Sequence, residues 1–148
     1  MKKQIIVLAA AILLTIGNTF ANKLNSDIPG RILNEFKKEF VQASNVNWET
    51  KATHYKVKFS LDEQNIEAFF SLEGNLLGVT RNMSFNHLPL HLQKDIKEKY
   101  VGYWITDLFE LSTDNGTEYV ITFENADEQI SLKGMTMNWD IFKKTDKS

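Results

Sequence analysis

The sequence of 148 residues contains no cysteine. This absence excludes disulfide bonds, thiol nucleophiles, thiolate zinc sites and the attachment of haem or lipid through a cysteine. Without such cross-links, the fold must be stabilised by a hydrophobic core. The chain can supply one, because it contains three tryptophans, four tyrosines and ten phenylalanines.

Proline, glycine and excess basic charge are also lacking. Two prolines and seven glycines, with 43% hydrophobic residues, are not typical of a disordered chain. The 17 basic side chains are outnumbered by 19 acidic ones. The chain therefore has no electrostatic reason to bind nucleic acid or an anionic membrane, and we expect no nucleic-acid partner.

Long apolar runs are absent except near the N-terminus, where residues 5–16 are almost all apolar. Lys2 and Lys3 precede this run and Ala21 follows it, which is the three-part pattern of an export signal. A membrane-spanning helix needs about 20 apolar residues, more than this run provides. We predict a signal peptide at 1–21, a periplasmic or secreted mature chain, and no stable membrane insertion after cleavage. A retained interfacial anchor is the alternative.

The first half of the mature chain has the pattern of a helix followed by strands. Residues 22–30 are polar and contain Pro29, so we expect a flexible leader there. Apolar residues then recur at helical spacing, at Ile32, Phe36 and Phe40. Period-two alternation and short loops predict an antiparallel series of strands. These strands are expected near residues 46–49, 55–59, 66–72 and 76–80.

The same order of elements restarts in the second half. Leu92, Ile96 and Tyr100 repeat the helical spacing of the first half. The pair Asn115-Gly116 predicts a type I′ hairpin turn, which needs two residues with positive φ. Strands are expected at 103–112, 118–124 and 129–133, with an edge strand at 139–142 before a charged tail at 143–148.

The two halves also share a strand motif, since residues 55–59 and 119–123 both alternate an aromatic, a β-branched aliphatic and a phenylalanine. We therefore predict an α+β fold with one domain at 31–142, made of two repeats at 31–84 and 88–142. Each repeat is a helix-plus-antiparallel-sheet unit, and the helices pack on one face of a shared sheet. We interpret the two repeats as a duplication, and the alternative is a chance likeness between two amphipathic segments. The alternative fold is a cystatin-like arrangement, in which one helix crosses a sheet.

Short motifs follow one another in order over residues 44–134. They are Val46-x-Trp48, Tyr55-x-Val57-x-Phe59, Glu67-Ala68-Phe69-Phe70, Glu73-Gly74-Asn75, Leu88-Pro89, Ile96-Lys97-Glu98-Lys99-Tyr100, Gly102-Tyr103 and Tyr119-x-Ile121-x-Phe123. Their order and spacing resemble the PepSY-like family, whose structural relatives include β-lactamase-inhibitor-like proteins. The resemblance implies an exported, non-enzymatic module that binds or inhibits another protein, and it offers no catalytic residues.

Catalytic and metal-binding patterns are scarce. The chain has no glycine-rich phosphate loop and no Gly-x-Ser-x-Gly nucleophile motif. His87, His91 and Asp95 recur every four residues and would share one face of a continuous helix, as metal ligands can. Because Pro89 interrupts that helix, we interpret them as incidental residues at an exposed helix start. His54 is expected to be solvated on the wet side of its strand. We expect no metal, no cofactor and no enzymatic activity.

Three aromatic residues depart from the alternation of their strands. Phe69 precedes Phe70, which holds the inward position, and Tyr103 is adjacent to Trp104, so that one of the two should face outward. Exposed aromatic residues on a sheet are typical anchors for a protein partner. We hypothesise that Phe69, with Tyr103 or Trp104, lies on the open face of the sheet and binds a partner. Packing of Phe69 under a loop is the alternative.

Two functions remain open. The first is a non-enzymatic module that binds an exported partner protein, such as a peptidase, through the open face of its sheet and inhibits or modulates it. The second is a carrier of a small apolar ligand between helix and sheet. An apolar pocket of roughly a few hundred cubic ångströms would favour the carrier, and a flat sheet with exposed aromatics would favour the binder.

Overall fold

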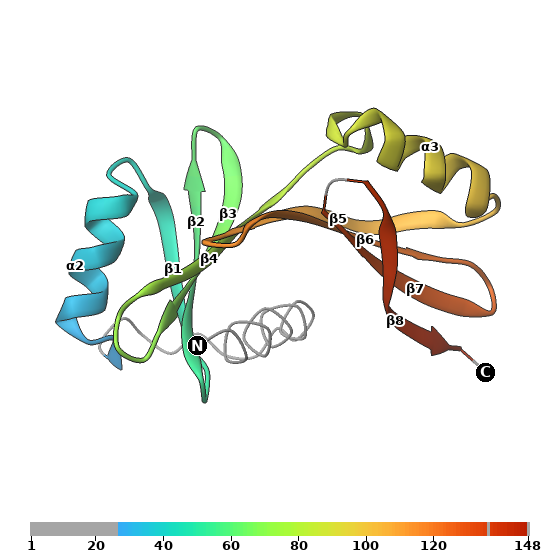
Figure 1. Ribbon diagram of the computed structural model, residues 1–148. Coiled ribbons are helices and arrows are strands. Elements are labelled where there is room, and N and C mark those ends of the chain that lie inside the picture. The colour runs from blue at the N-terminus through green and yellow to red at the C-terminus, as the bar shows by residue number, and fades with distance from the viewer. Residues whose placement is uncertain (1–26, 136, 148) are drawn as a thin grey trace.

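The structure of the protein is a computed structural model that describes residues 27–135 and 137–147. One sheet holds all eight strands in chain order, and each strand is antiparallel to the next. Figure 1 shows α2 beside the first strands and α3 beside the last ones. The elements are α2 (Gly30–Glu39), β1 (Ser44–Thr50), β2 (His54–Leu61), β3 (Gln64–Ser71), β4 (Leu76–Asn82), η2 (Phe85–His87), α3 (Leu90–Lys99), β5 (Trp104–Thr113), β6 (Gly116–Glu124), β7 (Glu128–Gly134) and β8 (Trp139–Asp146).

The first unit consists of α2 and the strands that follow it. The helix begins after Pro29, whose fixed φ suits a helix entrance. Ile32 and Phe36 lie one turn apart, and both are buried against alternate residues of β2 and β3. The Phe36 ring meets Trp48 and Phe59 edge-on, with centroid distances of 5.3 and 5.1 Å. The sequence pattern therefore located this helix and its buried side.

The second unit repeats this arrangement with α3. Leu92 and Ile96 are its buried aliphatic residues, one turn apart. Ile96 packs on alternate residues of β5, β6 and β7, and the Tyr100 and Phe123 rings lie 4.3 Å apart. The Trp139 Nε1 donates a hydrogen bond of 3.0 Å to the Leu92 carbonyl oxygen, which ties β8 to α3. The α+β prediction is confirmed, and each helix is followed by four strands.

A third apolar cluster joins the two units. It consists of Phe69 on β3, Phe109 and Leu111 on β5, and Val120 on β6. These residues alternate with those that pack against the helices, so they point to the other side of their strands. The β4–β5 ladder pairs Thr80 with Leu111 and so continues this side from one unit to the other. We call the side of the sheet that carries the cluster the second face.

The type I′ backbone expected at one hairpin occurs at another. Asp62 and Glu63 both have positive φ, 48° and 62°, which is the backbone of a type I′ turn between β2 and β3. The hairpin predicted at Asn115-Gly116 is present, but only Gly116 has a positive φ, of 115°. Gly116 is already the first residue of β6 and pairs with Thr113. The type I′ prediction is therefore wrong at this hairpin.

Both ends of the described chain are more ordered than expected. Ile28 is only 7% exposed and packs in the α2 cluster, so the prediction of a flexible leader at 22–30 is wrong at this residue. The strand predicted at 139–142 is longer than expected, because β8 continues to Asp146 and so includes most of the charged segment 143–148. Charged side chains do not prevent a strand from pairing at the edge of a sheet. The predicted signal peptide, 1–21, lies outside the described residues.

Candidate functional site

Phe69 does not lie at the surface. Its side chain is 0% exposed, and it packs with Phe109, Leu111 and Val120 on the second face. The Lys56 Nζ lies 5.7 Å from the centre of the Phe69 ring. The prediction of an exposed Phe69 is therefore wrong. The alternation of the strand correctly predicted that the Phe69 ring points away from α2. The side of the sheet to which it points is apolar around Phe69, and the ring is therefore buried.

Tyr103 and Trp104 point in opposite directions, as adjacent strand residues should. Tyr103 packs in the α3 cluster, and its hydroxyl donates a hydrogen bond to Glu128, which raises the pKa of Tyr103. Trp104 is 51% exposed, so it is the outward member of the pair. Its Nε1 donates a hydrogen bond of 3.0 Å to Glu124, and the Lys147 Nζ lies 5.4 Å from the ring centroid. The structure thus separates the three aromatics predicted to act together.

A network of ion pairs covers the first-unit part of the second face. The Lys56 Nζ lies 2.8 Å from a Glu67 carboxylate oxygen, although only 3% of the Lys56 side chain is exposed. Lys58, whose side chain is 43% exposed, lies 3.4 Å from Glu67 and 3.6 Å from Glu49. Lys51 pairs with Glu49 at 2.9 Å. The result is an alternating row of charges across β1, β2 and β3.

His54 lies beside this network and is only 1% exposed. Its Nδ1 is 3.0 Å from the Thr53 hydroxyl, while its Nε2 is buried without a partner among the described residues. Burial lowers the pKa of His54, and the positive charges of Lys51 and Lys56 lower it further. The prediction of a solvated histidine is wrong, and the centres of the His54 and Phe69 rings lie 5.8 Å apart.

Asp107 extends the charged region into the second unit. It pairs with Thr122 just after a bulge in β5. Burial raises the pKa of the Asp107 carboxyl, and the negative charge of Glu67 adds to this increase. A carboxylate of the first unit therefore acts on a carboxyl group of the second unit across this face.

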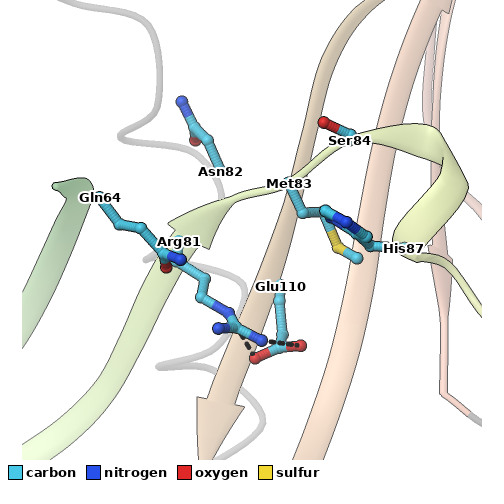
Figure 2. Close-up of a pocket in the computed structure, with 7 residues that line it drawn as sticks. All are labelled: Gln64, Arg81, Asn82, Met83, Ser84, His87 and Glu110. Carbon is cyan, nitrogen blue, oxygen red and sulfur yellow. Dashed lines mark hydrogen bonds and ion pairs between the residues drawn. The ribbon is translucent and has the colours of Figure 1, made fainter. Parts of the chain in front are cut away.

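A junction cleft of about 590 Å³ lies where the two units meet. Arg81 at the end of β4 and Glu110 on β5 form its ionic part, with two hydrogen bonds of 3.1 and 3.3 Å between guanidinium and carboxylate. Figure 2 shows Arg81 and Glu110 at one side, with Met83, Ser84 and His87 contributed by the segment after β4. No sequence pattern predicts this pair, because only the β4–β5 register brings Arg81 and Glu110 together.

A second cleft of about 310 Å³, the polar groove, lies at the same end of the sheet. Its lining includes Lys58 and Glu67 from the ion-pair network. Neither cleft contains a residue of α2 or α3, so neither is the apolar pocket between helix and sheet that a carrier needs. The remaining lining residues of the groove are Asn45, Phe59, Ser60, Asn65, Ile66, Thr80 and Asn82.

The histidines of the second unit do not assemble a metal centre. His87 belongs to η2 and precedes the helix, whereas His91 and Asp95 lie on α3. Across residues 27–135 and 137–147, no three histidine, aspartate or glutamate side chains are arranged to hold a metal ion. In the same part of the chain, no helix is both long and apolar enough to cross a membrane.

This fold, one antiparallel sheet with a helix before each set of four strands, defines the structural class of the protein. A family model described as "Putative beta-lactamase-inhibitor-like, PepSY-like" matches residues 20–78 and again residues 79–140. The chain therefore belongs to the PepSY-like, beta-lactamase-inhibitor-like family. The two matches meet within β4, close to the junction of the two units.

Solved structures share this fold at low sequence identity. A BLIP-like protein from Bacteroides fragilis is 22% identical, with a TM-score of 0.67 over 83% of this chain and 94% of its own. A DUF2874 family protein from Bacteroides uniformis is 12% identical, with a TM-score of 0.71 over 80% and 89%. A protein from Bacteroides eggerthii described as a putative periplasmic protein is 9% identical, with a TM-score of 0.71 over 80% and 88%. No curated protein matches the chain.

Proposed function

We propose that the protein is an exported, non-catalytic module that binds a partner protein through the second face of its sheet. The observation that carries the proposal is the continuity of this face across both units. Thr80 and Leu111 face each other on it, and Asp107 is influenced by Glu67. The same continuity supports our inference that α2 and α3 cover one side of the sheet and leave the other side to a partner.

The chemistry of the second face favours a protein partner. It offers charged side chains in an alternating row, where Lys58 stands between Glu49 and Glu67. At its second-unit end it offers Trp104, which is half exposed and already held in position by Glu124. An aromatic anchor beside a polar, charged surface is the usual composition of a protein interface.

Inhibition or modulation is the role we infer for this binding. The family description names β-lactamase-inhibitor-like proteins, and the described residues contain no metal-ligand cluster that would suggest catalysis instead. Export is supported by the basic and apolar pattern of residues 1–21 and by the description of the Bacteroides eggerthii neighbour. The carrier alternative has less support, because neither of the two clefts described above is lined by a residue of α2 or α3.

Inhibition assays test the proposal directly. The purified protein is titrated into a panel of purified β-lactamases and peptidases, and partners are captured in parallel from periplasmic extract for mass spectrometry. We expect saturable inhibition or capture that is lost in the variants Trp104→Ala and Lys58→Glu. The matched control is Lys38→Glu, an exposed lysine on α2.

The control variant tells whether the partner binds on the second face or on the helix side of the sheet. If Lys38→Glu abolishes binding while Trp104→Ala and Lys58→Glu retain it, the partner binds on the helix side and the proposal is wrong. If substrate turnover by the protein itself is detected, the non-catalytic assignment is wrong.

A further inference from the structure

Four exposed carboxamide side chains gather at one end of the sheet. Asn45 lies at the start of β1, Gln64 and Asn65 at the start of β3, and Asn82 at the end of β4. The start of β3 and the end of β4 are adjacent, because Ile66 pairs with Arg81. We call these four carboxamides the amide rim.

The amide rim connects the two clefts. Gln64 lines the junction cleft, Asn45 and Asn65 line the polar groove, and Asn82 lines both. Figure 2 shows Gln64 and Asn82 beside Arg81 at the junction cleft. A ligand at the rim could therefore extend into a cleft on either side of β4.

The fixed charges that line the two clefts are already paired. In the junction cleft, Arg81 binds Glu110 through two hydrogen bonds. In the polar groove, Lys58 pairs with Glu67, at 3.4 Å. A charged ligand would have to break one of these pairs, so both clefts favour an uncharged ligand.

The rim also has unused hydrogen-bonding capacity. Among the described residues, none donates a hydrogen bond to the side chains of Gln64, Asn65 or Asn82 or accepts one from them, and none of the three is paired elsewhere in the described chain. The Asn45 amide donates only a weak bond of 3.3 Å, to the Ser60 hydroxyl. Each carboxamide offers two N–H donors and one oxygen acceptor.

We propose that the amide rim binds an uncharged oligosaccharide. Sugar hydroxyl groups donate and accept at once, which matches carboxamides, and the C–H faces of the rings can pack on Ile66 in the groove and on Met83 in the junction cleft. The clefts, of about 310 and about 590 Å³, fall in the range of about 300 to 1,000 Å³ that holds small ligands.

An extended peptide fits the rim less well. Main-chain groups of a peptide lie on one line about 3.3 Å apart, whereas side chains on neighbouring strands stand about 4.8 Å apart. The rim side chains also line two different clefts. A sugar ring carries hydroxyl groups around its whole edge, so it can reach carboxamides in more than one direction. The polar groove shares Lys58 and Glu67 with the partner surface proposed above, but the four carboxamides of the rim are not part of that surface, and their binding of a sugar does not depend on it.

The test is a titration of ¹⁵N-labelled protein followed by NMR, because side-chain NH₂ groups give their own resonances. Maltotriose, cellotriose and chitotriose are the probes, at up to millimolar concentration. We expect saturable shifts in the NH₂ resonances of Asn65 and Asn82. The double variant Asn65→Ala/Asn82→Ala should weaken binding about tenfold or more, because two hydrogen bonds to the ligand are lost. The control Asn115→Ala, in the β5–β6 turn, should leave the affinity unchanged.

Three outcomes overturn the proposal. The first is the absence of any shift at the rim with all three sugars. The second is a stronger response to a trigalacturonate, which would show that an anionic ligand is preferred. The third is a response of the rim to a capped Gly-Ser peptide but to no sugar, which would assign the rim to a peptide. Unchanged backbone resonances away from the rim verify that the double variant is folded.

Discussion

Lys56 and Phe69 occupy facing positions on β2 and β3, and the Lys56 Nζ lies 5.7 Å from the centre of the Phe69 ring. The same Nζ is 2.8 Å from a Glu67 carboxylate oxygen, with only 3% of the Lys56 side chain exposed. A positive charge is thus buried beside an aromatic ring and depends on one close carboxylate. Removing a buried charge and removing its partner change the free energy of unfolding by different amounts.

The first prediction concerns this buried pair. Glu67→Ala leaves the Lys56 ammonium buried without its close partner, so we expect a loss of about 3 kcal/mol in the free energy of unfolding. Lys56→Met removes the charge but keeps the apolar stem over Phe69, and Glu67 retains Lys58 at 3.4 Å. We therefore expect Lys56→Met to change stability by less than about 1 kcal/mol. Urea unfolding of both variants measures the difference.

The comparison has a clear opposite outcome. If Lys56→Met lowers the free energy of unfolding more than Glu67→Ala does, the Lys56 ammonium itself stabilises the fold. The attraction between Lys56 and Glu67 would then exceed the cost of burying the charge. Lys94→Met, in an exposed pair on α3, is the matched control and should change stability by less than about 0.5 kcal/mol.

The second prediction concerns pH. The pKa of His54 is lowered from 6.5 by burial and by Lys51 and Lys56, against a smaller opposing effect of Glu49. The unfolded chain therefore binds the proton more readily than the folded one, so the contribution of His54 to stability is complete above pH 6.5 and is lost as the pH falls below it. The slope cannot exceed about 1.4 kcal/mol per pH unit for one group.

Variants at two histidines test this origin of the pH dependence. His54→Leu should flatten the loss of stability that urea unfolding shows as the pH falls below 6.5. His91→Leu, at an exposed position of α3, should keep the slope of the parent protein. An unchanged slope in His54→Leu would mean that another group causes the dependence.

The sequence predicted the elements that depend on local periodicity. Ile32 and Leu92 mark the buried sides of the two helices because apolar residues recur every three to four positions. Strand positions were predicted within a few residues, since alternation is strict where one side packs on a helix. The family resemblance was confirmed for the same reason, because its motifs are these elements in order.

The second face could not be predicted in this way. Alternation tells which residues share a side of a strand, but it does not tell whether that side is wet. Phe69 is buried because β5 and β6 place Phe109, Leu111 and Val120 beside it, and this depends on the long-range β4–β5 pairing. The junction cleft depends on the same pairing and was missed for the same reason.

The third prediction separates core from surface aromatics. Phe69→Ala should cost about 3 to 5 kcal/mol, because the ring is fully buried and its removal leaves a cavity. Trp104→Ala should cost less than about 1 kcal/mol, since Trp104 is half exposed and loses one hydrogen bond to Glu124. Chemical denaturation of each variant, followed by far-UV circular dichroism, measures both values. Equally small losses would contradict the burial of Phe69 and restore it as a candidate surface anchor.

The fourth prediction concerns the backbone of two hairpin turns, β2–β3 and β5–β6. Glu63 has a φ of 62°, which costs a residue with a Cβ about 1 kcal/mol relative to glycine. We therefore expect Glu63→Gly to raise the free energy of unfolding by about 0.5 kcal/mol, because the gain is partly offset by the greater freedom of glycine in the unfolded chain.

Gly116 is the reverse case. Its φ is 115° and no atom lies within 4 Å of the position that a Cβ would take, so Gly116→Ala should lose about 1 kcal/mol or more through backbone strain alone. The control Asn115→Ala should change stability by less than about 0.5 kcal/mol, because Asn115 has no positive φ. Thermal and urea unfolding of these three variants and of Asn115→Gly check these values. If Asn115→Gly instead stabilised the protein as strongly as Glu63→Gly, the β5–β6 hairpin would contain the type I′ turn after all.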